Sequence, residues 1–216
     1  MLLLMLFFFT VVIIALLITI FFVHARPRIR LRNNNKCDPA SVLVVVGSGG
    51  HTTEILTLVK ALGEHYSPRY YIVADTDQIS EKKIDECEKL KSDVKGQQNY
   101  KVFYIPRSRE VKQSYLTSVI TTLRAIIFCF PLVFKLRPEI ILCNGPGTCI
   151  PVCLAGMVLK CLRLQSTVIV YVESFCRVTS LSLSGKLLYH LADSFFVQWP
   201  ELLGKYPKAK YVGRLV

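Results

Sequence analysis

The pattern of apolar and polar positions along this chain predicts strands that alternate with helices. Residues 42–46 are all aliphatic, and four of the five are valine, which is typical of a parallel strand buried on both faces. Three glycines follow within positions 47–50, and apolar residues from Ile55 to Leu62 then repeat at the spacing of one helix face. Because the N–H groups and the dipole of a helix N-terminus point out of such a turn, the stretch predicts an anion site. A tight turn that binds nothing is the alternative.

The same alternation continues toward the end of the chain. Further strands are predicted at 69–74, 101–105, 139–143, 166–172 and 194–197, with helical segments at 80–99, 115–134, 149–159 and 184–192. Alternating buried strands and helices indicate a single Rossmann-like, doubly wound α/β domain with a parallel sheet over residues 41–216.

The first residues of the chain predict a membrane anchor. Residues 2–23 carry no charge and, apart from two threonines, no polar side chain; as a helix they would span about 33 Å, close to the thickness of a hydrocarbon core. A cleaved signal peptide is the alternative, but the start is uncharged and the exit contains Arg26 and Arg28. We therefore predict a transmembrane anchor over 1–24 and a basic linker over 25–40. Arginines that stay inside would leave the N-terminus in the lumen and the main domain in the cytosol.

Composition narrows the choice of partners. The formal net charge is +12, but much of the excess lies in residues 26–36, directly after the apolar run. A basic cluster in that place suits anionic lipid head groups, and we find no basic helix face or aromatic-basic interleaving, so we predict no nucleic-acid binding. The eight cysteines include no C-x2-C pair. They predict no metal site and a reducing compartment, and we predict no cofactor.

A second apolar stretch, residues 115–134, nearly has the length of a membrane span. Arg124 in its middle would cost about 2.5–3.5 kcal/mol on insertion, and Pro131 would kink the helix. We predict a helix that lies in the core or at an interface, with the N-terminal anchor as the only span.

Polar side chains are predicted to gather at one edge of the sheet, because doubly wound proteins bind ligands beyond the carboxyl ends of their strands. Backbone N–H groups and arginines suit phosphate, whereas carboxylates and amides suit hydroxyl groups. The mixture found here favours a phosphorylated, polyhydroxylated ligand; for the arginines, an exposed basic turn is the alternative. The candidates are Gly47, Ser48, Gly49, Gly50, His51 and Glu54 after the first strand, Asp75 and Asp77 after the second, Arg107 and Arg109 after the third, Asn144, Gly145, Gly147 and Thr148 after the fourth, and Glu173 after the fifth.

A dinucleotide is the obvious competing ligand. Its fingerprint requires G-x-G-x-x-G/A after the strand, but Thr52 occupies the third glycine position and His51 precedes it. A histidine in this loop suits a hydroxyl substrate that must be oriented or deprotonated. Alternatively, His51 caps the helix or binds a backbone carbonyl.

Several ordered motifs resemble one known family. They are VVGSGGHTTE at 45–54, ADTD at 74–77, IPRSRE at 105–110, CNGPGTC at 143–149, YVESFCR at 171–177 and QWP at 198–200. Together with a single N-terminal anchor, they resemble the membrane-anchored subunit of the eukaryotic UDP-N-acetylglucosamine transferase that adds the second sugar of the dolichol-linked oligosaccharide. The glycine loop with its histidine is similar, more distantly, to the acceptor half of the bacterial lipid-II-forming glycosyltransferases of the GT-B fold.

This resemblance implies a substrate pair and a partner. The acceptor would be N-acetylglucosaminyl-diphospho-dolichol, the donor UDP-N-acetylglucosamine, and the product a β-1,4 linkage made with inversion on the cytosolic face of the endoplasmic reticulum. A soluble catalytic subunit would bind the donor, in a heterodimer or a larger complex. Since no second α/β domain follows Val216, we likewise expect the donor site in trans. The tail of Gly213, Arg214, Leu215 and Val216 resembles the segment on which that partner docks.

His51 and Asp75 are the candidate bases for the acceptor hydroxyl. An imidazole titrates near physiological pH, whereas a carboxylate needs a raised pKa for this work. Two other functions compete with the transferase subunit: a membrane scaffold without chemistry, and a membrane-anchored nucleotide-dependent oxidoreductase.

Overall fold

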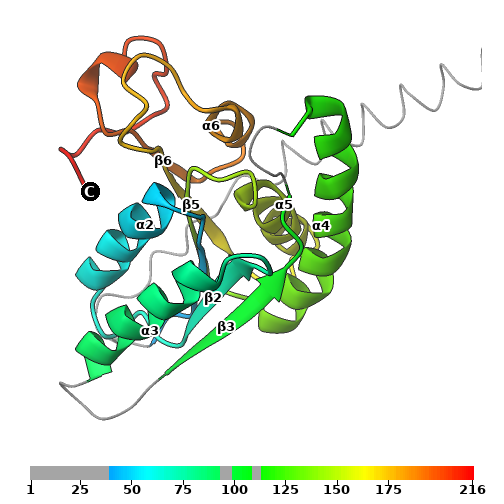
Figure 1. Ribbon diagram of the computed structural model, residues 1–216. Coiled ribbons are helices and arrows are strands. Elements are labelled where there is room, and N and C mark those ends of the chain that lie inside the picture. The colour runs from blue at the N-terminus through cyan, green and yellow to red at the C-terminus, as the bar shows by residue number, and fades with distance from the viewer. Residues whose placement is uncertain (1–38, 93–98, 109–112) are drawn as a thin grey trace, which may run out of the picture.

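The computed structural model describes residues 39–92, 99–108 and 113–216. The predicted anchor and nearly all of the linker lie outside these ranges. In the described part, six parallel strands form one sheet in the order β3-β2-β1-β4-β5-β6 (Figure 1). The strands are β1 (Val42–Val45), β2 (Arg69–Ala74), β3 (Tyr100–Ile105), β4 (Ile140–Asn144), β5 (Val168–Val172) and β6 (Ser194–Phe196). The predicted doubly wound α/β fold is confirmed.

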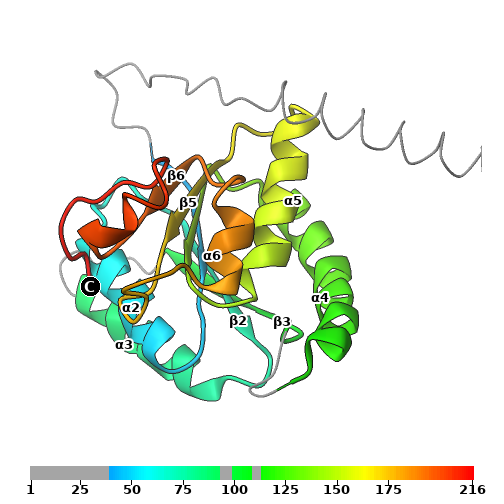
Figure 2. The same ribbon diagram turned by 90° about the horizontal axis from the view of Figure 1, so that it is seen from above.

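Helices cover both faces of the sheet (Figures 1 and 2). One face carries α2 (Gly50–Ala61) and α3 (Gln78–Ser92), and the other carries α4 (Tyr115–Leu136), α5 (Cys149–Cys161) and α6 (Leu183–Leu188). A short 3-10 helix spans Pro200–Leu202. The helix predicted at 184–192 is shorter than expected, because the N–H groups of Leu191 and Ala192 both bond to the carbonyl of Leu188 and turn the chain toward β6.

Side chains of β1 alternate between two apolar cores. Leu43 and Val45 pack with α4, α5 and α6, whereas Val42 and Val44 pack with α2 and α3. This is the two-residue period of a strand, and burial on both faces explains why every residue of β1 is aliphatic.

A buried ion pair joins β2 to α3. The Nε and Nη2 atoms of Arg69 donate to the two carboxylate oxygens of Glu88 at 2.7 and 2.6 Å, and the Tyr71 hydroxyl also donates to Glu88. Burial and the neighbouring carboxylate raise the pKa of Tyr71. The charged segment at 80–99 was predicted to be solvated, but it includes Glu88, which is only 2% exposed. The ion pair with Arg69 compensates the desolvation of this carboxylate.

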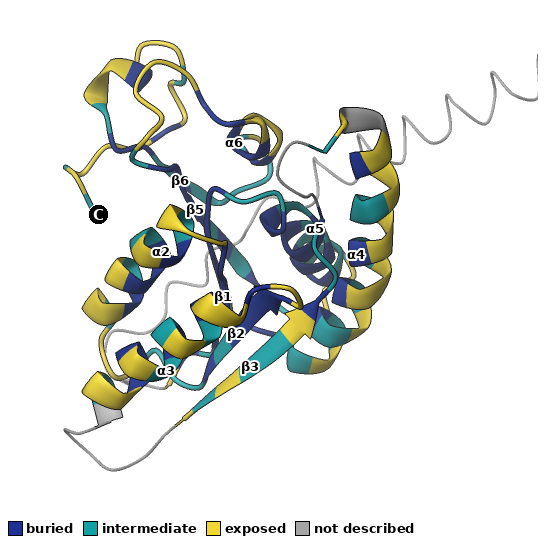
Figure 3. Cartoon of the chain, viewed as in Figure 1, coloured by how far each residue is buried: buried dark blue, intermediate teal, exposed yellow. Residues whose placement is uncertain are grey.

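The two apolar helices on the same face of the sheet differ in how they are covered (Figure 3). No residue of α5 is exposed, and seven of its thirteen are buried. In α4, Ala125, Cys129 and Val133 are buried, and the contacts with the core come from the second half of the helix. The residues 117–136 are long and apolar enough to cross a membrane by length and composition, with a mean hydropathy of 1.9. Only 17% of its most apolar 18-residue window is buried inside the protein, so α4 is not enclosed as a core helix.

Candidate functional site

Two glycine loops meet at the carboxyl edge of the sheet. The loop after β1 approaches the loop after β4 so closely that a Cβ on Gly47 would lie 2.7 Å from Cγ of Pro146. Gly145 has a φ of +76°, and a Cβ there would lie 2.7 Å from Nδ1 of His51. Side chains at these two positions would separate the loops, so glycine is required for the close approach.

Thr52, which occupies the position of the third glycine of a dinucleotide loop, has a structural role there. Its hydroxyl donates to the carbonyl of Gly47, and its oxygen lies 2.7 Å from Ser80 Oγ. Ser80 in turn donates to Asp77 at 2.7 Å. The predicted edge residue Asp77 thus fixes the start of α3 and, through Ser80 and Thr52, the underside of the first loop.

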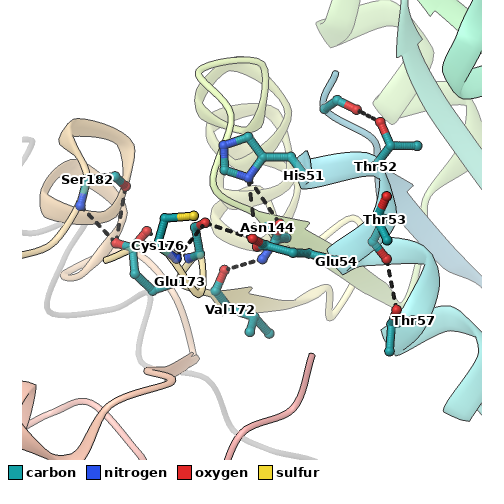
Figure 4. A network of polar contacts seen from close by, with 12 residues as sticks. His51, Thr52, Thr53, Glu54, Thr57, Asn144, Val172, Glu173, Cys176 and Ser182 are labelled. Carbon is teal, nitrogen blue, oxygen red and sulfur yellow. Dashed lines mark hydrogen bonds and ion pairs between the residues drawn. The ribbon is translucent and has the colours of Figure 1, made fainter. Parts of the chain in front are cut away.

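The N-terminus of α2 opens toward the site. Gly49, with a φ of +67°, precedes the helix and supplies no side-chain cap. Added Cβ atoms at Gly49 and Gly50 would meet nothing within 4 Å, so a ligand could approach the backbone of this turn closely within the described structure. His51 does not cap the helix, because its ring is directed toward β4 (Figure 4). The geometry is that of a helix N-terminus available to an anion.

His51 lies in a polar network built from three strand ends (Figure 4). Its Nδ1 is 3.3 Å from Oδ1 of Asn144 and 3.9 Å from Oε2 of Glu54. The Asn144 amide also donates to the carbonyl of Val172 at 3.2 Å, and Glu54 accepts a 2.9 Å hydrogen bond from Ser174 Oγ. The His51 side chain remains 34% exposed, whereas that of Glu54 is 14% exposed. The imidazole ring is therefore held at the surface by fully buried Asn144 and mostly buried Glu54.

Glu173 is completely buried behind this network. Its two oxygens accept hydrogen bonds from the backbone N–H of Ser174 at 3.0 Å and from the N–H and hydroxyl of Ser182 at 3.0 and 3.1 Å. Burial raises the pKa of the Glu173 carboxyl, and these hydrogen bonds oppose that shift. Since a Cβ on Gly185 would overlap its Oε2, Glu173 holds the start of α6 against the end of β5.

A cavity of about 1190 Å³ opens between the glycine loops, α4 and α6. On its polar side lie the first loop, Arg107 at the end of β3 and the loop after β4. Its apolar lining comes from Val119 and Leu123 of α4 and from Leu183 and Leu187 of α6, beside polar residues of the same helices. A pocket of this size with both polar and apolar lining suits a large amphipathic ligand.

The structure brings most of the predicted site residues to this cavity. Gly49 forms the turn, Asn144 and Glu173 lie buried behind the wall, Asp75 is exposed at the end of β2 and outside the lining, and Arg109 lies outside the described residues. The predicted residues that line the cavity are Gly47, Ser48, Gly50, His51, Glu54, Arg107, Gly145, Gly147 and Thr148.

Some lining residues were not predicted from the sequence. Ser108 is 1% exposed, and its hydroxyl has no partner among the described residues. Ser118 and Thr122 extend the polar wall along α4. Their only signal in the sequence was polarity inside an apolar segment, and Ser108 was hidden between two more conspicuous arginines.

The C-terminal tail folds back onto its own domain. The Arg214 guanidinium stacks over Trp199 at 4.5 Å and over Phe175 at 5.6 Å. The N–H of Leu215 donates to Oε1 of Gln198 at 2.8 Å, and the Leu215 side chain packs at the edge of the core shared with α2 and α3. Gly213, with a φ of +94°, allows the turn into this position.

Comparison with known proteins gives one family and one fold. Residues 42–215 match the family described as "Oligosaccharide biosynthesis protein Alg14 like". Three relatives bear the name UDP-N-acetylglucosamine transferase subunit ALG14: those of Rattus norvegicus (53% identical, 81% of this chain and 82% of that one), Homo sapiens (52%, 82% and 83%) and Schizosaccharomyces pombe (45%, 80% and 81%).

Among solved structures, MurG of Acinetobacter baumannii matches with a TM-score of 0.53 at 15% identity, over 75% of this chain and 42% of that one. LpCGTa in complex with UDP matches with a TM-score of 0.50 at 11% identity, over 82% and 53%. The chain thus spans less than half of MurG and about half of LpCGTa. These likenesses concern the fold, and they confirm the predicted Rossmann-like sheet of the GT-B kind.

Proposed function

Because the chain belongs to the Alg14 family of oligosaccharide biosynthesis proteins, we propose that it acts as the membrane-anchoring subunit of a UDP-N-acetylglucosamine transferase. In this role it recruits a soluble, donor-binding catalytic subunit and offers the acceptor side of a shared active site. The complex adds the second, β-1,4-linked N-acetylglucosamine to N-acetylglucosaminyl-diphospho-dolichol.

The cavity between the two glycine loops is the observation that carries the acceptor assignment. The free N–H groups at the start of α2 and the guanidinium of Arg107 suit a diphosphate. Polar groups of the loop after β4, including Thr148, suit sugar hydroxyls, whereas the leucines of α4 and α6 suit the first isoprene units of a lipid chain. One amphipathic acceptor would satisfy both walls.

In the proposed reaction, a base removes the proton from the acceptor 4-hydroxyl while UDP leaves from the partner's side. His51 fits this role because it lines the cavity and keeps an exposed ring edge. Asp75 is the second candidate, although it lies exposed and outside the cavity lining. We therefore assign the base to His51, with Asp75 as the alternative.

Three features support a position at the cytosolic face of the endoplasmic reticulum membrane. Residues 2–23 have the length and composition of an anchor. The buried face of α4 fixes that helix to the sheet, so we propose that its exposed apolar face lies flat on the membrane beside the cavity rather than crossing it. All seven cysteines in the described part of the chain are free thiols, which suits a reducing compartment.

Reconstitution tests the proposed function. The full chain would be co-expressed with the soluble donor-binding subunit, purified in detergent and assayed for transfer from UDP-N-acetylglucosamine to an N-acetylglucosaminyl-diphospho-polyprenol. We expect a lipid-linked disaccharide only when both chains are present. Absence of transfer by an intact, co-purified complex would refute the proposal.

Two variants separate a catalytic subunit from a scaffold. His51→Ala should co-purify with the partner at normal yield and lower the transfer rate at least about 100-fold, as expected for a general base. A scaffold would leave the rate unchanged. Deletion of Leu215 and Val216 should instead reduce co-purification, and intact recruitment would show that the partner docks elsewhere.

A further inference from the structure

The amide of Asn144 has only one orientation open to it. The carbonyl of Val172 can only accept a hydrogen bond, so the amide nitrogen of Asn144, 3.2 Å away, faces it. The amide oxygen is then left for His51, whose Nδ1 lies 3.3 Å from it. Asn144 is fully buried, so no water competes for these two bonds.

This orientation determines where a neutral His51 carries its proton. An amide oxygen accepts, so Nδ1 must donate, and the lone pair of the neutral ring then lies on Nε2. In Figure 4 the second ring nitrogen points away from Asn144 and Glu54, and Nε2 has no hydrogen-bond partner within the described residues. The basic atom of the ring is therefore left free for a ligand.

The carboxylate of Glu54 lies where it can interact with the charged form of the His51 ring. Its Oε1 is fixed by the hydroxyl of Ser174 at 2.9 Å, while Oε2 is buried, has no hydrogen bond within the described residues and lies 3.9 Å from Nδ1 of His51. A mostly buried carboxylate at this distance interacts more favourably with an imidazolium than with a neutral ring.

We propose that Asn144 and Glu54 are positioning residues for the transfer reaction. Asn144 holds neutral His51 as the Nδ1–H tautomer, and Glu54 stabilises the imidazolium that forms when the ring takes a proton. The inference rests on the proposed function, in which His51 is the base.

The proton and electron pairs balance in this step. The acceptor O4–H bond breaks, and its proton moves to Nε2 of His51. The oxygen lone pair forms the new bond to C1 of the donor sugar, while the C1–O bond to UDP breaks and its electron pair leaves with the UDP phosphate. Nδ1 keeps its proton throughout, between Asn144 and Glu54.

A double-mutant cycle in the co-purified complex tests the role of Asn144. We expect Asn144→Ala to lower kcat about 10- to 100-fold and to change KM for the acceptor less than about twofold. If Asn144 acts through His51, the same substitution should have no further effect in the His51→Ala background. An equal loss in both backgrounds, or a normal kcat for Asn144→Ala alone, would overturn the proposal.

A conservative variant at Glu54 refines the test. Glu54→Gln keeps an oxygen for Ser174 and removes the charge, and it should lower kcat about 10-fold with normal co-purification. A Glu54→Gln complex with unchanged kcat would remove Glu54 from the proposal.

Nitrogen NMR of the wild-type complex covers the case in which Asn144→Ala does not fold. With ¹⁵N-histidine, the His51 signals are identified by their loss in His51→Ala. A neutral ring protonated at Nδ1 is expected, and protonation at Nε2 would overturn the inference. The wild-type transfer assay keeps the two failures apart, because an active complex with uncoupled Asn144 contradicts only the inference, whereas an inactive wild type contradicts the proposed function.

Discussion

Helices α4 and α5 lie side by side on one face of the sheet, and both are apolar along most of their length. No residue of α5 is exposed, and Gly156 packs so close to β4 that a Cβ would overlap Ile141. α4 instead exposes more than half of the surface of residues such as Ile120 and Ile127. The apolar side chains of α5 are therefore covered by the protein itself, whereas several apolar side chains of α4 remain exposed and available to another surface.

The difference teaches how to interpret an apolar helix beside a site. Five large exposed apolar residues of α4, two of them also lining the cavity, lie on the same helix as exposed Arg124. Scattered exposed apolar residues are ordinary on a soluble protein, but a cluster of five on one helix is not. The residues of that cluster are Val119, Ile120, Leu123, Ile127 and Phe128.

The largest expected effect is a loss of stability in α5. Leu159 is 0% exposed, and Leu159→Ala should lower the free energy of unfolding by about 2–5 kcal/mol, since it removes buried methyl groups and leaves a cavity. Urea-induced unfolding of the full chain in a fixed detergent measures it. A change below about 1 kcal/mol would mean that α5 is covered less tightly than it appears in the structure.

A smaller effect is expected on the exposed face of α4. Ile120→Asp should raise KM for a long-chain lipid acceptor in liposomes about 10-fold or more, because burial of an isoleucine in the membrane contributes about 1.5–3 kcal/mol. Ile79→Asp is the matched control, since Ile79 on α3 is exposed to the same 71% but lies on the opposite face of the sheet. Equal effects of the two substitutions would contradict a contact between α4 and the membrane.

Arg124 sharpens the comparison further. It is exposed within the apolar stretch of α4, and a basic residue near an anionic membrane surface contributes about 1 kcal/mol. Arg124→Gln should therefore raise the acceptor KM about fivefold in liposomes that contain anionic lipid, and this difference should vanish in neutral liposomes or at high salt. An equal effect in both kinds of liposome would exclude a head-group contact.

The smallest effect is expected for a substitution matched to the first. Leu123 on α4 is 55% exposed, so Leu123→Ala should change the free energy of unfolding by about 0.5 kcal/mol or less. The same urea titration applies. A loss as large as that of Leu159→Ala would show that α4 is covered by the protein after all.

The sequence predicted the elements well and the site only in part. The unbroken aliphatic run of β1 and the glycines after it were sufficient for the strand, turn and helix. The prediction that polar residues gather at the carboxyl edge also holds, but position along a strand does not determine burial. Asn144 and Glu173 have the same polarity pattern as a ligand contact, yet both are fully buried, because their partners come from the neighbouring strand ends and from α6.

Hydropathy likewise could not distinguish α4 from α5. Which helix is enclosed depends on what packs beyond it, and that is set by the path of the chain after β5, where Leu188 of α6 joins the core beside α5. The apolar wall of the cavity could not be predicted for the same reason, since Leu183 and Leu187 reach it only through the placement of α6.

The pairing of β4 with β5 has a consequence for the fidelity of folding. Asn144 is the last residue of β4 and stands opposite Val172 in the parallel ladder. A slip of one residue would turn its amide to the other face of the sheet. The residues before it, Ile141, Leu142 and Cys143, are apolar at every position, so a slipped strand would still be buried, yet it would leave His51 without the amide. In this protein, turnover can therefore report an error in strand alignment that apolar burial alone would tolerate.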